Sequence, residues 1–323
     1  MSRAIGVDIG GTKIAAGVVA EDGQVLDTEL RPTPGRDVRA TEDAIAEVVS
    51  ALRERHDAPA VGIGAAGWIA ADRATVLFSP HLAWRDEPLR AALAERIPGA
   101  LIIENDANAA AWAEYRFGAA QGASVVVCIT LGTGIGGGLI IDGQVYRGAY
   151  GVAGEFGHMT LVPDGRRCAC GNRGCWEMYA SGRALARDAR ELADVSAVAA
   201  ERMIELAGDD PMHITGPVVT QAAREGDPAA LEIFETMGRW LGQGIASLAA
   251  GLDPEVFVIG GGLSDAGDLL LRPARDTFRL ALTGRGYRPA ARVEVARLGP
   301  AAGLVGAADL ARAAAASADQ RGH

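Results

Sequence analysis

A short glycine-rich segment occurs twice in this chain, and the duplication constrains its fold more than any other feature. Residues 11–17 (GTKIAAG) align with residues 132–138 (GTGIGGG), with a glycine, a threonine and an isoleucine in register. Three apolar residues follow each copy, and an Asp-Gly-Gln-Val turn comes next, with a shift of one residue. A match at both the loop and the distal turn favours a duplicated unit over chance similarity between glycine-rich hairpins. We therefore expect two related halves, each opening with a β-hairpin.

Between the hairpins, short apolar runs alternate with longer amphipathic runs, which is typical of an α/β fold. Residues 157–210 are expected to form an insert in the second half, and residues 317–323 a frayed end. The expected strands are 4–8, 14–20, 24–30, 60–65, 100–104, 124–130 and 255–259, and the expected helices are 41–55, 106–117, 218–225, 228–250 and 301–316.

One charge-free apolar run, residues 123–141, is long enough to raise the question of a membrane span. It contains five glycines within residues 132–138, and glycine weakens a helix by about 1 kcal/mol relative to alanine. Two strands around a glycine turn explain the run better. The N-terminal apolar strand breaks at Asp8, too early for a signal peptide. We therefore expect a cytoplasmic protein, with no membrane partner and with reduced cysteines.

The charge balance argues against a nucleic-acid binder. The 323 residues carry a formal net charge of −10, and no basic run is present. Lys13 is the single lysine, and it lies in the first glycine-rich loop. Its position there is a weak indication of function.

The first loop, DIGGTK at residues 8–13, lies between two expected strands. Its glycines let backbone N–H groups approach phosphate oxygens, and Thr12 adds a hydroxyl donor. Asp8 is placed to hold hydrated Mg²⁺ near the same point. A plain hairpin turn with an aspartate cap accounts for these residues equally well, so both interpretations stay open.

The second loop matches G-x-G-x-x-G at Gly132, Gly134 and Gly137. A dinucleotide-binding loop must open a helix, whereas an apolar strand follows here, so that interpretation fails. A second phosphate-binding hairpin, facing the first across a cleft, remains.

Asn105 and Asp106 end an expected strand and open an expected helix. A carboxylate at this point is often only a helix cap, worth about 1 kcal/mol. The ends of strands are also where α/β proteins bind ligands, and a carboxylate there can accept a proton from a sugar hydroxyl. The residues alone leave both roles open.

Residues 155–177 combine one histidine with three closely spaced cysteines. His158, Cys168, Cys170 and Cys175 have the number and type of ligands of a closed, structural zinc site. Such a site would fix Glu155 and Glu177 nearby as acceptors for sugar hydroxyls. The alternative is that both are ordinary surface glutamates without a role in binding.

These motifs resemble those of the ROK family of sugar kinases over nearly the whole chain. The matching segments are DIGGTK (8–13), ENDAN (104–108), LGTGIGGG (131–138), EFGH (155–158) and CACGNRGCWE (168–177). The resemblance implies an α/β, duplicated, actin-like ATPase (ribonuclease H-like) fold of two lobes, with a zinc-binding insert in the second. It implies a small lobe of residues 1–117 and 300–323 and a large lobe of residues 118–299. It also implies a homo-oligomer, either a dimer or a dimer of dimers.

The resemblance also implies ATP-dependent phosphorylation of glucose at the 6-hydroxyl, with Asp106 as the base. His158 would bind zinc through one ring nitrogen and sugar through the other. The implied sugar contacts are Gly67, Asn105, Asp106, Glu155, His158 and Glu177; the zinc ligands are His158, Cys168, Cys170 and Cys175; the Mg²⁺ and nucleotide contacts are Asp8, Gly10, Gly11, Thr12, Lys13, Thr133, Gly134, Gly260, Gly261 and Gly262.

Three alternatives remain open. The first is a kinase for another hexose or an N-acetylhexosamine, and the second is a glucokinase that uses polyphosphate instead of ATP. The third is a sugar-responsive regulator, since the family includes repressors with an N-terminal helix-turn-helix. The first expected strand begins near Ala4 and the net charge is −10, so we favour the enzyme.

Overall fold

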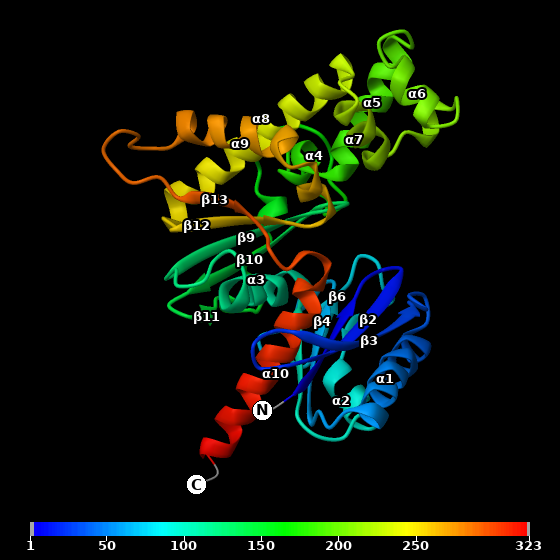
Figure 1. Ribbon diagram of the computed structural model, residues 1–323, viewed down its shortest axis with the longest axis vertical. Coiled ribbons are helices and arrows are strands. Elements are labelled where there is room, and N and C mark those ends of the chain that lie inside the picture. Colours follow the sequence, from blue (N-terminus) through cyan, green and yellow to red (C-terminus); the bar gives the residue numbers. More distant parts are fainter. Residues whose placement is uncertain (1–2, 322–323) are drawn as a thin grey trace. The chain divides into compact units, whose positions relative to one another are not determined.

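The computed structural model describes residues 3–321, without the side chains of residues 318–321 (Figure 1). The chain divides into two compact units. The first contains the residues up to Cys128, Gly138–Gly154 and the residues from Arg297 onward; the second contains Ile129–Gly137 and Glu155–Ala296. Residues 118–128, 138–154 and 297–299 therefore group with the first unit, whereas the implied lobes assign them to the second.

The first sheet has five strands in the order β3-β2-β1-β4-β8. Three strands form an antiparallel meander, and β1, β4 and β8 run parallel. The carboxyl ends of the three parallel strands therefore share one edge of the sheet. The strands are β1 (Ala4–Ile9), β2 (Lys13–Val19), β3 (Val25–Pro32), β4 (Ala60–Ala65) and β8 (Leu101–Asn105).

The second sheet repeats this order as β11-β10-β9-β12-β13, so the duplication predicted from the two hairpins is confirmed. The boundary between the units passes through β9 and β10. The apolar run forms β9 and β10, as the glycines indicated. None of the helices in residues 3–321 combines the length and apolar character that crossing a bilayer requires. The strands are β9 (Val125–Leu131), β10 (Ile135–Ile141), β11 (Gln144–Val145), β12 (Val256–Gly260) and β13 (Arg292–Val295).

Helix α10 (Ala302–Arg321) packs directly against the first sheet (Figure 1). A Cβ at Gly6 of β1 would lie 1.8 Å from the Leu304 carbonyl oxygen, and one at Gly62 of β4 would lie 1.8 Å from that of Ala307. Glycine is therefore required at both positions for the close approach. The helix continues to Arg321, so the expectation of a frayed end is wrong for residues 317–321. Residues 322–323 lie outside the described part of the chain.

The other elements of the first unit are the helices α1 (Val38–Arg55), α2 (Leu89–Ala94) and α3 (Asp106–Phe117), the 3-10 turn Gly299–Ala301, and a small sheet of β5 (Trp68–Ile69), β6 (Val76–Phe78) and β7 (Arg85–Glu87). Helix α3 begins and ends where the sequence predicted.

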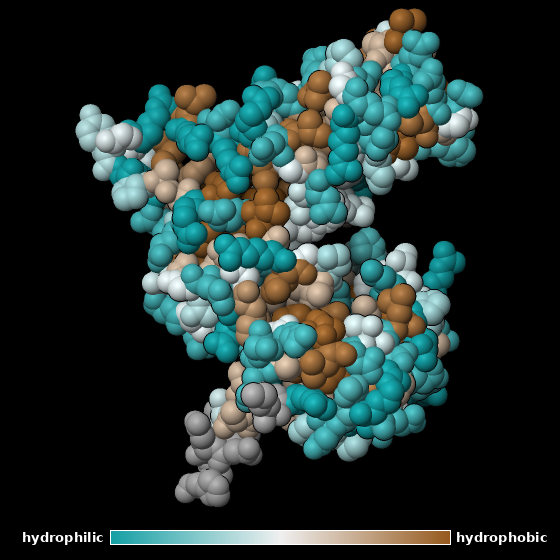
Figure 2. Space-filling view, viewed as in Figure 1, coloured by the Kyte–Doolittle hydropathy of each residue, from teal (hydrophilic) through white to brown (hydrophobic). Residues whose placement is uncertain are grey.

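The second unit is largely helical outside its share of the sheet. The long helix α8 contacts α9 through Gly238 and Gly242, and Gly244 lies against the buried ring of Trp176. On the face shown in Figure 2, hydrophilic side chains predominate and hydrophobic side chains gather in patches between them. The helices are α4 (Glu177–Ala180), α5 (Gly182–Val195), α6 (Glu201–Leu206), α7 (Gly216–Arg224), α8 (Pro228–Leu252) and α9 (Asp268–Ala281), with 3-10 turns at Phe156–His158, Pro211–His213 and Gly262–Ala266.

Candidate active site

In the first unit, the candidate residues lie where the three parallel strands end. Asp8 of β1 is opposite Gly64 of β4, which is opposite Glu104 of β8. The next residues of the chain after β8 are the first residues of α3. This edge is where α/β sheets bind ligands, and it brings Asp8, Gly67, Asn105 and Asp106 into one region of the unit.

Asp106 is the first residue of α3, and its carboxylate is held by two hydrogen bonds. The backbone N–H of Ala107 and the side-chain amide of Asn105 both donate to Oδ1, each over 2.9 Å. Asn105 caps the helix by accepting from the backbone of Asn108 over 2.9 Å, and its amide also donates to the Gly67 carbonyl over 3.0 Å. Asn105 thus connects the predicted base to the turn at Gly67.

The backbone around Gly67 leaves no room for a side chain. Its φ is +140°, and a Cβ there would lie 2.4 Å from the Phe78 carbonyl oxygen. The turn that follows β4 therefore has one tight geometry, in which the Gly67 carbonyl accepts from Asn105.

The two carboxylates at this edge influence each other. Burial raises the pKa of Asp106, and the Ala107 N–H opposes the rise. Burial and the charge of Asp106 raise the pKa of Asp8 from 3.8 to about 7, with Lys13 opposing. A divalent cation would relieve this repulsion, and carboxylate oxygens are the ligands that Mg²⁺ prefers. The residues present therefore fit a magnesium ion.

The raised pKa of Asp8 predicts a pH-dependent stability difference. The folded state binds the proton more tightly than the unfolded chain, so the free energy of unfolding falls as pH rises from about 4 to about 7. The substitution Asp8→Asn removes this loss. In magnesium-free buffer, its stability relative to the wild type should increase by about 2.5 kcal/mol between pH 5 and pH 8. Denaturant unfolding at both pH values measures the change, and a constant difference would contradict the raised pKa.

The first glycine loop is a tight turn between β1 and β2. The Gly10 N–H donates to the Lys13 carbonyl over 3.0 Å, and the Thr12 carbonyl accepts from Thr33 over 3.1 Å. A Cβ at Gly11 would lie 2.9 Å from the Cβ of His81. Gly11, Thr12 and Lys13 are exposed, so the loop presents its backbone and the lysine to solvent.

No local sequence motif marks His81, although the fold places it beside the first glycine loop. It lies beside Gly11, and its charge when protonated lowers the pKa of Asp106. The loop that carries it is fixed by Arg85, whose guanidinium donates to the carbonyls of Ser79, Leu82 and Trp84.

In the second unit, the second glycine loop contacts the start of the helical insert. The Gly132 carbonyl accepts from the Gly182 N–H over 2.8 Å. A Cβ at Gly134 would lie 2.5 Å from a carboxylate oxygen of Glu177. The predicted phosphate loop and one predicted sugar ligand are therefore neighbours.

The third glycine motif lies beside the same loop. Gly261 has a φ of +82°, and a Cβ there would lie 2.4 Å from the carbonyl oxygen of Leu131, the residue before Gly132. Gly260 ends β12, and Gly262 opens the 3-10 turn that follows.

The ligand atoms of His158, Cys168, Cys170 and Cys175 all lie within 4.8 Å of one another. The Cys170 and Cys175 sulfurs are 3.6 Å apart, and Cys168 Sγ is 3.6 Å from His158 Nδ1. A tetrahedral zinc ion with bonds of about 2.3 Å holds its sulfur ligands roughly 3.8 Å apart. Three thiols and one imidazole at these distances fit zinc.

Glu155 and Glu177 lie next to the cluster. The Nε2 atom of His158 is 3.8 Å from a Glu155 carboxylate oxygen, whereas Nδ1 faces Cys168. The Glu177 carboxylate is 3.1 Å from the Cys168 sulfur. The imidazole thus has Nδ1 on the side of the cluster and Nε2 on the side of Glu155.

A family model described as "ROK family" matches residues 4–314. The chain belongs to the ROK family. A glucokinase of Streptomyces coelicolor is 52% identical to this ROK protein over 97% of the chain and 98% of its own length. Among solved structures, a ROK-family glucokinase of Streptomyces griseus in complex with glucose and AMPPNP has a TM-score of 0.89 and 52% identity, over 97% of this chain and 100% of its own. A ROK hexokinase of Thermus thermophilus has a TM-score of 0.82 and 35% identity, over 98% and 99%.

Proposed function

We propose that this ROK protein transfers the γ-phosphoryl group of ATP to the 6-hydroxyl of glucose and is a glucokinase. The observation that carries the proposal is the similarity, over 97% of the chain, to a glucokinase in complex with glucose and AMPPNP. Asp106 at the start of α3 and the two glycine loops also support the proposal. Phosphoryl transfer to a sugar uses a carboxylate base and loops that bind phosphate.

In the first unit, Asp106 is the proposed base. Asn105 and Gly67 hold the sugar near Asp106, because the Asn105 side chain is hydrogen-bonded to both Asp106 and Gly67. Asp8 and the loop of Gly10, Gly11, Thr12 and Lys13 bind the magnesium–phosphate group. Mg²⁺ when bound neutralises part of the phosphate charge.

In the second unit, Glu155, Glu177 and the Nε2 atom of His158 are proposed to bind sugar hydroxyls. Thr133 and Gly134 contact the transferring phosphoryl group, and Gly260, Gly261 and Gly262 contact adenosine. Zinc would be held by His158 Nδ1 and the three sulfurs, where it supplies rigidity. Four protein ligands leave no open position for catalysis.

As the 6-hydroxyl oxygen bonds to the γ-phosphorus, the bond from that phosphorus to the β,γ-bridging oxygen breaks and ADP leaves. The hydroxyl proton passes to the Asp106 carboxylate. Charge on the phosphoryl oxygens is stabilised by backbone N–H donors of the glycine loops, because such fixed donors need no rearrangement during the reaction.

A panel of donors against a panel of sugars tests this function. ATP, ADP and polyphosphate are each offered with glucose, fructose, mannose, allose and an N-acetylhexosamine, and the sugar phosphate is measured. We expect the highest kcat/KM for ATP with glucose, and by at least about 10-fold over the other sugars, since a mismatched hydroxyl leaves polar groups in the site unpaired. A higher kcat/KM for another sugar or for polyphosphate would replace the substrate assignment. The homo-oligomeric state and the cytoplasmic location stay predictions from the sequence.

A further inference from the structure

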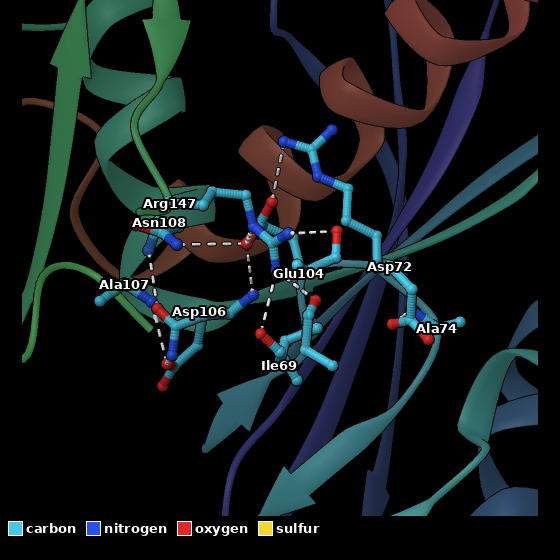
Figure 3. A network of polar contacts seen from close by, with 12 residues as sticks. Ile69, Asp72, Ala74, Glu104, Asp106, Ala107, Asn108 and Arg147 are labelled. Atoms are coloured by element: carbon cyan, nitrogen blue, oxygen red, sulfur yellow. Dashed lines mark hydrogen bonds and ion pairs between the residues drawn. The ribbon is translucent and has the colours of Figure 1, made fainter. Parts of the chain in front are cut away.

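A buried carboxylate lies directly before the proposed base. Glu104 is 1% exposed at the end of β8. Its Oε1 atom accepts from the backbone N–H of Asn105 over 3.0 Å, from the Asn108 side chain over 3.2 Å and from Arg147 Nε over 3.0 Å (Figure 3). Two of the three donors belong to the segment that opens α3. Glu104 therefore contacts residues on both sides of Asp106, through the Asn105 backbone and the Asn108 side chain.

Arg147 connects this carboxylate to the segment after Gly67. The side chain is 9% exposed, and its two Nη atoms donate to the carbonyls of Ile69, Ala70 and Ala71 over 3.0–3.2 Å (Figure 3). The chain after Arg147 packs against the same segment, since a Cβ at Gly151 would be 2.4 Å from the Ile69 carbonyl oxygen. One guanidinium thus joins the Gly67 turn to the start of α3.

A second arginine approaches from the same turn. Asp72 accepts from the backbone N–H groups of Ala74 and Thr75 over 2.9 and 3.2 Å. Arg73, which follows Asp72, has a φ of +53°. Arg73 Nη2 lies 3.2 Å from Glu104 Oε2. Each oxygen of the buried carboxylate therefore faces a different arginine.

We infer that Arg147 and Glu104 are positioning residues for the proposed reaction: they hold the sugar-binding turn at Gly67 in register with Asn105 and Asp106. The inference rests on the proposed function. Without the guanidinium, Glu104 loses its buried partner, and the turn loses three hydrogen bonds. Only the partly exposed Arg73 then remains to pair with Glu104. Loss of the buried charged partner of a buried carboxylate is costly, so its surroundings rearrange.

The geometry requires an arginine and not only a positive charge. Arg147 reaches one carboxylate and three carbonyls with three separate nitrogens. A lysine has one nitrogen, and cannot span these acceptors. Arg147→Lys therefore separates positioning from charge.

The experiment compares Arg147→Met and Arg147→Lys with the wild type in steady-state kinetics for glucose and for ATP. A shift of about 1 Å at a reacting centre costs about 100-fold, so we expect kcat/KM for glucose to fall about 100-fold in Arg147→Met. In Arg147→Lys it should fall at least about 10-fold, and in both variants the KM for ATP should stay within about twofold of the wild type.

Arg312→Met is the matched control. Arg312 is 14% exposed, pairs with the buried Asp309 over 2.7 Å, and donates to the carbonyls of Val19 and Ala20 over 3.0 Å. It lies near the start of β1, at the opposite end of the strand from Asp8. Its loss should lower the melting temperature and leave both KM values unchanged.

Three results would overturn the inference: wild-type glucose kinetics in Arg147→Met, full rescue by Arg147→Lys, or an equal fall of kcat/KM for glucose in Arg312→Met. If Arg147→Met does not fold, Arg147→Lys alone decides between the outcomes. A wild-type protein without sugar kinase activity would contradict the proposed function instead. The two failures are therefore distinguishable.

Discussion

Replacing Asp106 by asparagine is expected to lower kcat by about 1,000-fold while glucose still binds. A positioned general base contributes roughly 10²–10⁴-fold, and asparagine has nearly the same shape but cannot accept the proton. The amide oxygen still accepts the hydrogen bonds that Ala107 and Asn105 donate to the carboxylate. A coupled assay measures kcat, and titration calorimetry measures glucose affinity.

The same substitution should raise the melting temperature. Burial raises the pKa of Asp106, so at neutral pH the ionised carboxylate is less stable in the folded state than in the unfolded chain. An asparagine carries no charge and avoids this cost. A variant that is both inactive and more stable than the wild type would indicate that the carboxylate serves the reaction and not the fold.

Asp37→Asn is the control for Asp106. Asp37 also opens a helix of the first unit, where it accepts from the Ala40 N–H over 3.0 Å. Asparagine caps helices as well as aspartate does, so activity should not change. Full turnover in Asp106→Asn would remove Asp106 from the role of base.

Replacing Cys175 by serine is expected to abolish zinc binding and to unfold the ligand loop. Cys175 is fully buried in the cluster, and structural zinc sites contribute about 10–16 kcal/mol of apparent binding free energy in small zinc peptides. Metal content measured by mass spectrometry should fall from about one zinc ion per chain to almost none. The melting temperature should fall with it, and the KM for glucose should rise because Glu155, His158 and Glu177 lose their support.

Cys128→Ala controls for the loss of a buried cysteine. Cys128 is buried in β9, and burial raises the pKa of its thiol to about 12. This variant should lose some stability from the smaller side chain and keep its zinc. A Cys175→Ser variant with wild-type stability and activity but no zinc would contradict a structural metal.

Local sequence signals predicted the elements that carry the site. Asn105 caps α3 and Gly118 ends it, so the predicted bounds of 106–117 are the observed ones. The duplicated hairpins predicted the repeated strand order, since loop and turn residues fix a hairpin locally. The cysteine and histidine spacing gathered four ligand atoms as expected.

Contacts between distant segments were not predictable. Arg147 meets Glu104 at a separation of 43 residues and the Ile69 carbonyl at 78, and no motif surrounds it. Gly6 and Gly62 appear in the sequence as ordinary strand glycines, although their role is to admit α10. His81 lies beside the first glycine loop only because the chain folds back to it.

The position of the phosphate on the product tests the central claim most directly. The protein is incubated with glucose, ATP and Mg²⁺, and the sugar phosphate is analysed by phosphorus–proton correlation in nuclear magnetic resonance. We predict one phosphomonoester, coupled to the two protons on carbon 6, formed in equal amount to ADP and formed about 1,000-fold more slowly with Asp106→Asn. A phosphate on another carbon, or ADP formed without a sugar phosphate, would contradict the account.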